Sequence, residues 1–279
     1  MIEFNSIETI TDFIEKCKRE SKSIGFVPTM GALHKGHYSL IERAKNDNDI
    51  VICSIYINDF QFNQREDFDN YPKTLDEDKF GLKQVSCDVL FLPTKENLFS
   101  ASIESEYFLG GLDLTMEGHY RPGHFNGVAK VVERFLEIIK PDNAYFGEKD
   151  YQQLAVIKYL AKEKNISTNI IGVNTKRESS GLAMSSRNLR LSEEDKIKAS
   201  TIYKTLLFAK NNVGILSPNQ IVEKAKELLK LNFRIDYFLI VDENSLQPIS
   251  SWSTAKAPRA FVAVFLSNVR LIDNISLID

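Results

Sequence analysis

The chain has 279 residues, 43% hydrophobic and 26% charged, which is the balance of a globular protein with one large domain or two smaller ones. The formal net charge is −3 and basic residues are interleaved with acidic ones, which excludes the concentrated basic face of a nucleic-acid-binding protein. Three widely spaced cysteines match neither a disulfide framework nor zinc-ligand spacing, and no secretory or membrane-spanning pattern is visible, so we expect a cytoplasmic protein.

The first part of the chain alternates short apolar runs with helical patterns. We predict strands over 23–29, 50–57, 88–93, 143–147 and 168–173, and helices over 7–17, 37–46, 74–85, 124–140 and 150–164. Buried β-branched runs separated by helices are typical of parallel strands joined by crossovers. We therefore predict an α/β fold, with a Rossmann-like doubly wound parallel sheet over residues 1–173. Its ligands would lie beyond the carboxyl ends of the strands.

The pattern changes after about residue 173. A polar, turn-rich connection leads to two predicted helices, which open at 192–195 and 217–220. In the second, Ser217, Pro218 and Gln220 suit the N-cap, N1 and N3 positions. Strand candidates follow over 234–242, 260–266 and 269–274, with short links that favour an antiparallel sheet. Residues 174–279 are therefore predicted to form a smaller α+β C-terminal lid domain.

The segment VPTMGALHKGH, residues 27–37, combines a strand end, two glycines and two histidines at the start of a predicted helix. Gly31 and Gly36 would let the backbone approach a ligand, and the helix N-terminus would favour an anion. His34 and His37, three residues apart, could both donate to one phosphate. Two capping or surface histidines are the alternative, but the strand and the glycines favour the phosphate site.

Two later segments could complete a phosphate site. YFGEKDYQQL lies at the end of a predicted strand and opens a helix, and its Lys149 could counter phosphate charge while Asp150 caps that helix. Gln153, one turn further on, could reach a hydroxyl or carboxylate of a ligand. GLAMSSRN carries two adjacent hydroxyls and Arg187 in a glycine-containing loop that could close on a polyphosphate. Taken alone, the first segment would favour an ordinary capped helix with surface charges, and the second could be a linker.

Three weaker signals leave alternatives open. Asn58 and Gln61 follow a predicted strand, where their amides could bind a small polar substrate or cap the chain. Arg121 and His124 could border the pocket, or His124 could simply start the long helix. The acidic cluster 76–78 is more typical of a solvated helix start than of a metal site.

Taken together, these motifs resemble the pantoate–β-alanine ligases, the pantothenate synthetase family of the nucleotidyltransferase superfamily. The resemblance covers nearly the whole chain and rests on six segments in the family's order: PTMGALHKGHYSLI, QF…ED…YPK, RPGHFNGV…VV, PDNAYFGEKDYQQL, GLAMSSRN and RLIDN. The family's H-x-G-H signature is matched by residues 34–37. The resemblance implies an ATP-dependent ligase that makes pantoyl adenylate and then transfers the acyl group to β-alanine, releasing AMP and pyrophosphate.

The resemblance also implies roles for individual residues. His37 would be the proton donor, assisted by His34 and Lys149. The ATP site would comprise Met30, Gly31, Ala32, Leu33, His34, Lys35, Gly36, His37, Gly147, Glu148, Lys149, Asp150, Lys176, Met184, Ser185, Ser186 and Arg187. Gln61, Gln153 and Asn58 would bind pantoate, and Gln61 would also border the β-alanine position. No protein metal site is expected, because Mg²⁺ would arrive on the ATP phosphates. A homodimer joined through the N-terminal domain is implied, with small molecules as the other partners.

Three positions depart from the family pattern. Asp59 stands where the family usually has proline, Lys176 where it has valine, and Ser180 where aspartate is common. Lys176 is tolerable if the contact to the nucleotide is made by backbone. None of the three removes a group that carries the proposed chemistry.

Two other functions share these motifs. A nucleotidylyltransferase would move AMP or CMP to a phosphorylated acceptor and stop, whereas a nucleotide sensor would bind without catalysis. The C-terminal domain and the uncharged Gln61/Gln153 pair favour the ligase, because amides suit the hydroxyls and carboxylate of pantoate better than a phosphate.

Overall fold

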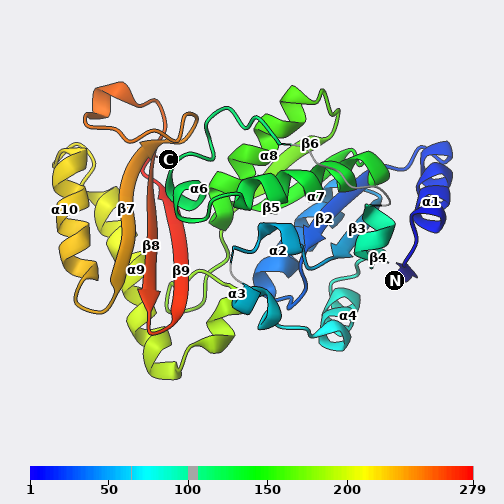
Figure 1. Ribbon diagram of the computed structural model, residues 1–279, viewed down its shortest axis with the longest axis horizontal. Helices are drawn as coiled ribbons and strands as arrows, with labels where there is room; N and C mark the ends of the chain where they lie inside the picture. The colour runs from blue at the N-terminus through cyan, green and yellow to red at the C-terminus, as the bar shows by residue number, and fades with distance from the viewer. Residues whose placement is uncertain (64, 100–105, 279) are drawn as a thin grey trace. The chain divides into compact units, whose positions relative to one another are not determined.

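The computed structural model describes residues 1–63, 65–99 and 106–278. The chain forms two compact units, which are considered separately (Figure 1). The first comprises Met1–Glu148 and Gln152–Asn174, and the second comprises Lys149–Tyr151 and Thr175–Asp279. No helix in the described part of the chain is both long and apolar enough to span a bilayer.

The first unit is built on a six-stranded sheet with the order β1-β4-β3-β2-β5-β6. Each pair of neighbours is parallel. The strands are β1 Ile2–Phe4, β2 Ile24–Thr29, β3 Ile50–Ile55, β4 Val89–Phe91, β5 Asn143–Gly147 and β6 Asn169–Val173. The predicted Rossmann-like doubly wound sheet is confirmed, except that the short edge strand β1 was not predicted.

Helices cover both faces of this sheet. The helices between these strands are α1 Ile7–Arg19, α2 Lys35–Asp47, α3 Arg65–Asp69, α4 Leu75–Gln84, α5 Lys95–Leu98, α6 Met116–Tyr120, α7 His124–Ile139 and α8 Tyr151–Glu163. Adjacent strand residues face opposite sides of a sheet. Phe26 of β2 packs against Phe135 of α7, with ring centroids 5.5 Å apart, whereas Val27 joins the core made with Leu40 and Ile41 of α2. The α2 and α7 helices therefore lie on opposite faces.

The second unit contains a three-stranded antiparallel sheet with helices against it, as predicted. Its strands are β7 Arg234–Asp242, β8 Pro258–Leu266 and β9 Val269–Ser276, and its helices are α9 Glu193–Asn211 and α10 Pro218–Leu229. The predicted cap of α10 is confirmed, since Ser217 Oγ accepts the Gln220 N–H at 3.3 Å and Gln220 Oε1 accepts the Ser217 N–H at 2.9 Å. The α+β prediction is thus confirmed (Figure 1).

Candidate active site

The connection from β2 to α2 is a tight left-handed turn at the carboxyl end of the sheet. Gly31 has φ +83° and Ala32 has φ +50°. A Cβ atom on residue 31 would lie 3.1 Å from Asp78 Oδ2, so this position needs glycine both for its backbone conformation and for space. The Thr29 hydroxyl accepts the Gly31 N–H at 3.3 Å and donates to the Ser54 carbonyl at 2.7 Å, which fixes the start of the turn to β3.

The two histidines cap the helix that follows this turn. The α2 helix begins at Lys35, two residues earlier than predicted, so Gly36 lies in the first helical turn and His34 is the N-cap. His34 Nδ1 accepts the Gly36 N–H at 3.1 Å, and His37 Nδ1 accepts the His34 N–H at 3.3 Å. The ring centroids lie 4.1 Å apart. Capping and pairing of the imidazoles are therefore parts of one arrangement.

These hydrogen bonds define which nitrogen of each ring carries the proton. A backbone N–H can only donate, so Nδ1 of His34 and Nδ1 of His37 must both be unprotonated acceptors. Each neutral imidazole then carries its proton on Nε2. Both Nε2 atoms are donors at a helix N-terminus, where the peptide dipoles also favour negative charge. The pair is chemically suited to a phosphate group.

Asp78 contradicts the expectation that the acidic cluster 76–78 is a solvated helix start. Asp76 and Glu77 are exposed on α4, but Asp78 is buried. Its carboxylate accepts the N–H groups of Ala32 at 2.9 Å and Leu33 at 2.7 Å. Burial raises its pKa, although these hydrogen bonds oppose the rise. Helical spacing could have revealed the difference, because Asp78 lies one turn before the buried Leu82.

Gln61 ends a 3₁₀ turn, Asp59–Gln61, that follows β3 and is capped by Asn58. Asn58 is buried, and its Oδ1 accepts the Phe60 N–H at 3.1 Å. Its Nδ2 donates to the Gln61 Oε1 at 3.2 Å and to the Gly127 carbonyl at 3.0 Å. The capping interpretation of Asn58 is therefore correct, and direct contact with a substrate stays a prediction. Gln61 Nε2 lies 2.9 Å from Met30 Sδ, which places this amide beside the turn before α2.

The α6–α7 connection supplies further polar groups to the Gln61 turn. His124 is the first residue of α7, as one interpretation of the sequence required, and its Nδ1 lies 2.9 Å from the Gln61 carbonyl oxygen. Arg121 Nη2 lies 3.3 Å from the same oxygen. Both residues therefore contact the predicted substrate-binding turn through its backbone.

The turn after β5 divides between the two units. Gly147 ends β5, and the half-buried Glu148 belongs to the first unit, as does the half-buried Gln153 on α8. The adjacent Gln152, which sequence reasoning missed, is buried. It donates to the carbonyls of Leu112 at 2.8 Å and Thr115 at 2.9 Å, which is a structural role.

Lys149 and Asp150 belong to the second unit. Lys149 Nζ lies 3.5 Å from Asp150 Oδ1, and the Lys149 carbonyl accepts from Asn274 Nδ2 at 2.9 Å. Tyr151 is fixed by the Arg259 guanidinium, 3.8 Å from its ring centroid. Strand β8 and strand β9 thus hold the segment that carries Lys149.

The Met184–Arg187 loop lies in the same unit as Lys149. The Met184 N–H donates to the Lys176 carbonyl at 3.0 Å, and Ser185 Oγ accepts the Arg187 N–H at 3.3 Å. Ser185 caps a 3₁₀ helix, Ser186–Arg190. The Lys176 side chain is exposed while its backbone carbonyl pairs with the loop, and a backbone contact from this residue to the nucleotide stays a prediction.

Arg177 anchors the base of this loop. Its two terminal nitrogens donate to the Asp273 carboxylate at 2.6 and 3.0 Å, and Nη1 also lies 3.2 Å from the Gly181 carbonyl. The guanidinium stacks on Tyr203 at 3.9 Å from the ring centroid. Sequence reasoning did not single out Arg177 or Asp273, although RLIDN contains the latter.

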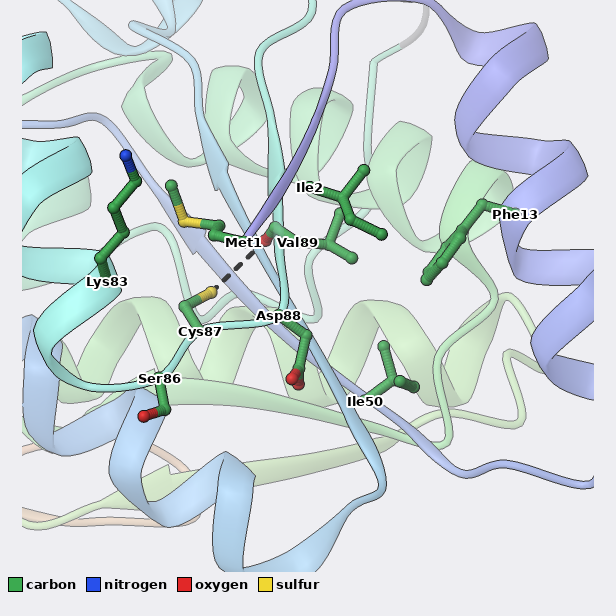
Figure 2. Close-up of a pocket in the computed structure, with 9 residues that line it drawn as sticks. All are labelled: Met1, Ile2, Phe13, Ile50, Lys83, Ser86, Cys87, Asp88 and Val89. Atoms are coloured by element: carbon green, nitrogen blue, oxygen red, sulfur yellow. Dashed lines mark hydrogen bonds between the residues drawn. The ribbon is translucent and has the colours of Figure 1, made fainter.

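A cavity of about 510 Å³ lies at the amino-terminal ends of β1, β3 and β4, away from the candidate site at the carboxyl ends (Figure 2). It is lined by Met1, Ile2, Phe13, Ile50, Lys83, Ser86, Cys87, Asp88 and Val89. The carboxylate in this cavity, Asp88, has a structural role, because its Oδ2 accepts the Val51 N–H at 2.8 Å and pairs with Lys45 Nζ at 2.9 Å. Burial raises the pKa of Cys87 to about 11, so this thiol is not a nucleophile near neutral pH.

The chain was compared with known proteins. Residues 3–276 match the family model described as pantoate-beta-alanine ligase. A pantothenate synthetase of Flavobacterium psychrophilum is 42% identical over 281 residues, spanning 99% of this chain and 100% of the relative. One from Azobacteroides pseudotrichonymphae is 44% identical over 266 residues, spanning 94% of each.

Solved structures are similar over the same length. A pantothenate synthetase from Thermus thermophilus matches with a TM-score of 0.93 and 37% identity over 100% of both chains. A pantoate-beta-alanine ligase from Francisella tularensis, crystallised with beta-gamma ATP and beta-alanine, matches with a TM-score of 0.80 and 36% identity over 99% of this chain and 98% of that one. The fold is therefore shared with these proteins over nearly the whole chain.

Proposed function

Because the chain belongs to the pantoate–β-alanine ligase family, we propose that it condenses pantoate with β-alanine using ATP, through a pantoyl-adenylate intermediate. In the first step a pantoate carboxylate oxygen attacks the α-phosphorus of ATP and pyrophosphate leaves. In the second, the β-alanine amine attacks the acyl carbon, the C–O bond to AMP breaks, and the amine loses a proton. Adenylation is needed because a carboxylate is a poor acyl donor, whereas AMP is a good leaving group.

The histidine pair is the observation that carries this proposal. Because both Nδ1 atoms accept backbone N–H groups, both rings present Nε2–H donors at the start of α2. Such donors stabilise the charge that develops on phosphate oxygens as pyrophosphate leaves, and they do so without a fixed positive charge. His37 is assigned the proton-donating role, with His34 as its partner.

Two sets of residues are proposed to contact the nucleotide. One set is the turn from Met30 to His37 with Gly147 and Glu148. The other is Lys149, Asp150, Lys176 and the Met184–Arg187 loop, in which Lys149 and Arg187 would be cations for the triphosphate. Placing ATP and pantoate together supplies much of the rate, because it converts an encounter between two solutes into a reaction within one complex.

Gln61 and Gln153 would bind pantoate, with Asn58 behind Gln61. An amide both donates and accepts, which suits pantoate's hydroxyls and carboxylate. The Francisella tularensis relative was crystallised with beta-gamma ATP and beta-alanine, which supports the assignment of these two substrates. Mg²⁺ would reach the site on the ATP phosphates, since hard oxygen ligands are its preference. Among the described residues no cluster of three or more His, Cys, Asp or Glu could hold a metal ion.

ATP–pyrophosphate exchange tests the proposal. We expect exchange with ATP, Mg²⁺ and pantoate, no exchange without pantoate, and formation of pantothenate and AMP once β-alanine is added. Exchange that ignores pantoate but responds to a phosphorylated acceptor would indicate a nucleotidylyltransferase instead. The implied homodimer and cytoplasmic location stay predictions, of which sedimentation velocity tests the first.

A further inference from the structure

The Gln61 side chain has a defined orientation. Its Oε1 accepts from Asn58 Nδ2, whose other acceptor is the Gly127 carbonyl, while Asn58 Oδ1 accepts the Phe60 N–H. Each of these atoms therefore meets a complementary partner. The donating end of the Gln61 amide, Nε2, is turned toward Met30 at 2.9 Å. A carboxylate or hydroxyl placed beside Met30 would meet an N–H donor.

The backbone of Gln61 is held as firmly as its side chain. The carbonyl oxygen of Gln61 lies 2.9 Å from His124 Nδ1 and 3.3 Å from Arg121 Nη2. Gly127, one turn into α7, makes this approach possible, because a Cβ atom there would overlap the Phe60 carbonyl.

The partners of His124 define its protonation state. Its Nε2 lies 3.2 Å from Arg121 Nη1, and a guanidinium can only donate. A carbonyl oxygen can only accept, so His124 must donate from Nδ1 to Gln61 and accept at Nε2 from Arg121. The imidazole is thus neutral in this arrangement, with one tautomer selected. Arg121 is further paired with the buried Glu117 at 3.8 Å.

We infer that Arg121 and His124 are positioning residues that fix the backbone of Gln61 and so the direction of its side-chain amide, and that they thereby determine affinity for the hydroxy acid substrate. This rests on the proposed function, in which Gln61 binds pantoate. The physical reason is that Gln61 ends a one-turn 3₁₀ helix, Asp59–Gln61, which is too short to hold its own geometry. The hydrogen bonds from Arg121 and His124 to the Gln61 carbonyl supply the rigidity that a binding amide requires.

Steady-state kinetics of four proteins test the inference. His124→Ala removes the donor to the Gln61 carbonyl, and we expect the KM for pantoate to rise about tenfold, the effect of one misaligned hydrogen bond. The KM for ATP should change by less than about twofold. His124→Asn replaces the Nδ1 donor with an amide N–H, and we expect it to restore most of the pantoate affinity. His119→Ala, which changes an exposed histidine on α6, is the matched control and should resemble the wild type.

The outcomes are distinct. An unchanged pantoate KM in His124→Ala overturns the inference, as does an equal rise in both KM values or a failure of asparagine to rescue, since these indicate a general structural role. If wild-type exchange does not depend on pantoate, the proposed function fails, and the inference that rests on it fails too. Thermal unfolding of each variant identifies a loss of fold.

Discussion

Asp78 accepts the backbone N–H of Leu33 at 2.7 Å, from a helix 45 residues further along the chain. The other oxygen accepts the Ala32 N–H at 2.9 Å. Both donors belong to the turn in which Gly31 and Ala32 have left-handed backbone conformations and which places His34 at the start of α2. One buried carboxylate therefore holds the conformation of the proposed nucleotide turn, and its replacement should affect nucleotide binding first.

We expect Asp78→Asn to raise the KM for ATP about tenfold and to destabilise the protein by about 1–3 kcal/mol. Asparagine has nearly the same shape, but its NH₂ group would face a backbone N–H, leaving one buried donor unpaired. ATP–pyrophosphate exchange at varied ATP and urea unfolding measure the two effects. Glu77→Gln, an exposed neighbour on α4, is the control and should change stability by less than about 0.5 kcal/mol. An unaltered ATP KM in Asp78→Asn would show that the turn does not need this carboxylate.

His37→Ala should lower the rate of adenylation by about 10²–10⁴, the usual contribution of a positioned acid. Single-turnover formation of AMP measures this first step. Retained turnover in His37→Ala would remove its assigned role.

Lys149→Ala should also slow adenylation while the melting temperature changes little, because its ammonium forms an ion pair with the neighbouring Asp150 at 3.5 Å, a contact within one short segment. The same single-turnover assay and a thermal unfolding curve measure the two effects. A collapse in thermal stability in Lys149→Ala would indicate a structural role for this lysine.

Asp242 makes the stability of the second unit depend on pH. Its partial burial would raise the pKa, but the N–H groups of Ala257, Asn244, Ser245 and Lys256 outweigh this and hold the pKa below the ordinary 3.8. On acidification the unfolded chain therefore takes up the proton before the folded one. The stabilisation is complete above pH 3.8 and is lost as the pH falls through the lowered value of the folded state.

We expect Asp242→Asn to be less stable than wild type by about 1 kcal/mol near neutral pH, with the difference shrinking as the pH approaches about 2. Urea unfolding at a series of pH values measures the gap between the two proteins. Glu223→Gln, which changes an exposed carboxylate on α10, provides the comparison. A gap that stays constant across the series would contradict the linkage.

Asp273→Asn should destabilise the second unit by about 3–5 kcal/mol and loosen the Met184–Arg187 loop, because it leaves the Arg177 guanidinium largely buried without its charged partner. Differential scanning calorimetry measures the loss of stability, and proteolysis between 180 and 187 measures the loop. The pair Lys196–Glu193, in which the carboxylate is exposed, offers a contrast, since Glu193→Gln should cost less than about 1 kcal/mol. Equal effects of the two substitutions would show that burial of the Arg177 pair is unimportant.

Local patterns predicted the larger elements of this fold. Apolar runs and helical periodicity located the central strands and the long helices, and the Ser217 and Gln220 spacing predicted the cap of α10. The edge strand Ile2–Phe4 was missed because three residues with two exposed side chains carry almost no periodic signal. Its identity depends on pairing with β4, which no short segment of sequence contains.

The candidate site was predictable only in part for the same reason. Residues 34–37 carry their signal locally, as glycines and histidines after a strand. The importance of Asp78 arises from its distant bonds to Ala32 and Leu33, and that of His124 from its contact with Gln61, 63 residues away. A short motif cannot express such relationships, so Asp78 was misjudged and both interpretations of His124 stayed open.

The allocation of Lys149–Tyr151 to the second unit has a consequence for dissection of the chain. Truncation at residue 174 would delete Arg259, Phe261 and Asn274. The segment Lys149–Tyr151 would then lose every partner described for it in β8 and β9. The first turn of α8 would fray, and Lys149 would lose its ordered position. The amino-terminal fragment would thus contain Lys149 without holding it in place. Mixing separately produced fragments would therefore be a more informative complementation assay than studying either fragment alone.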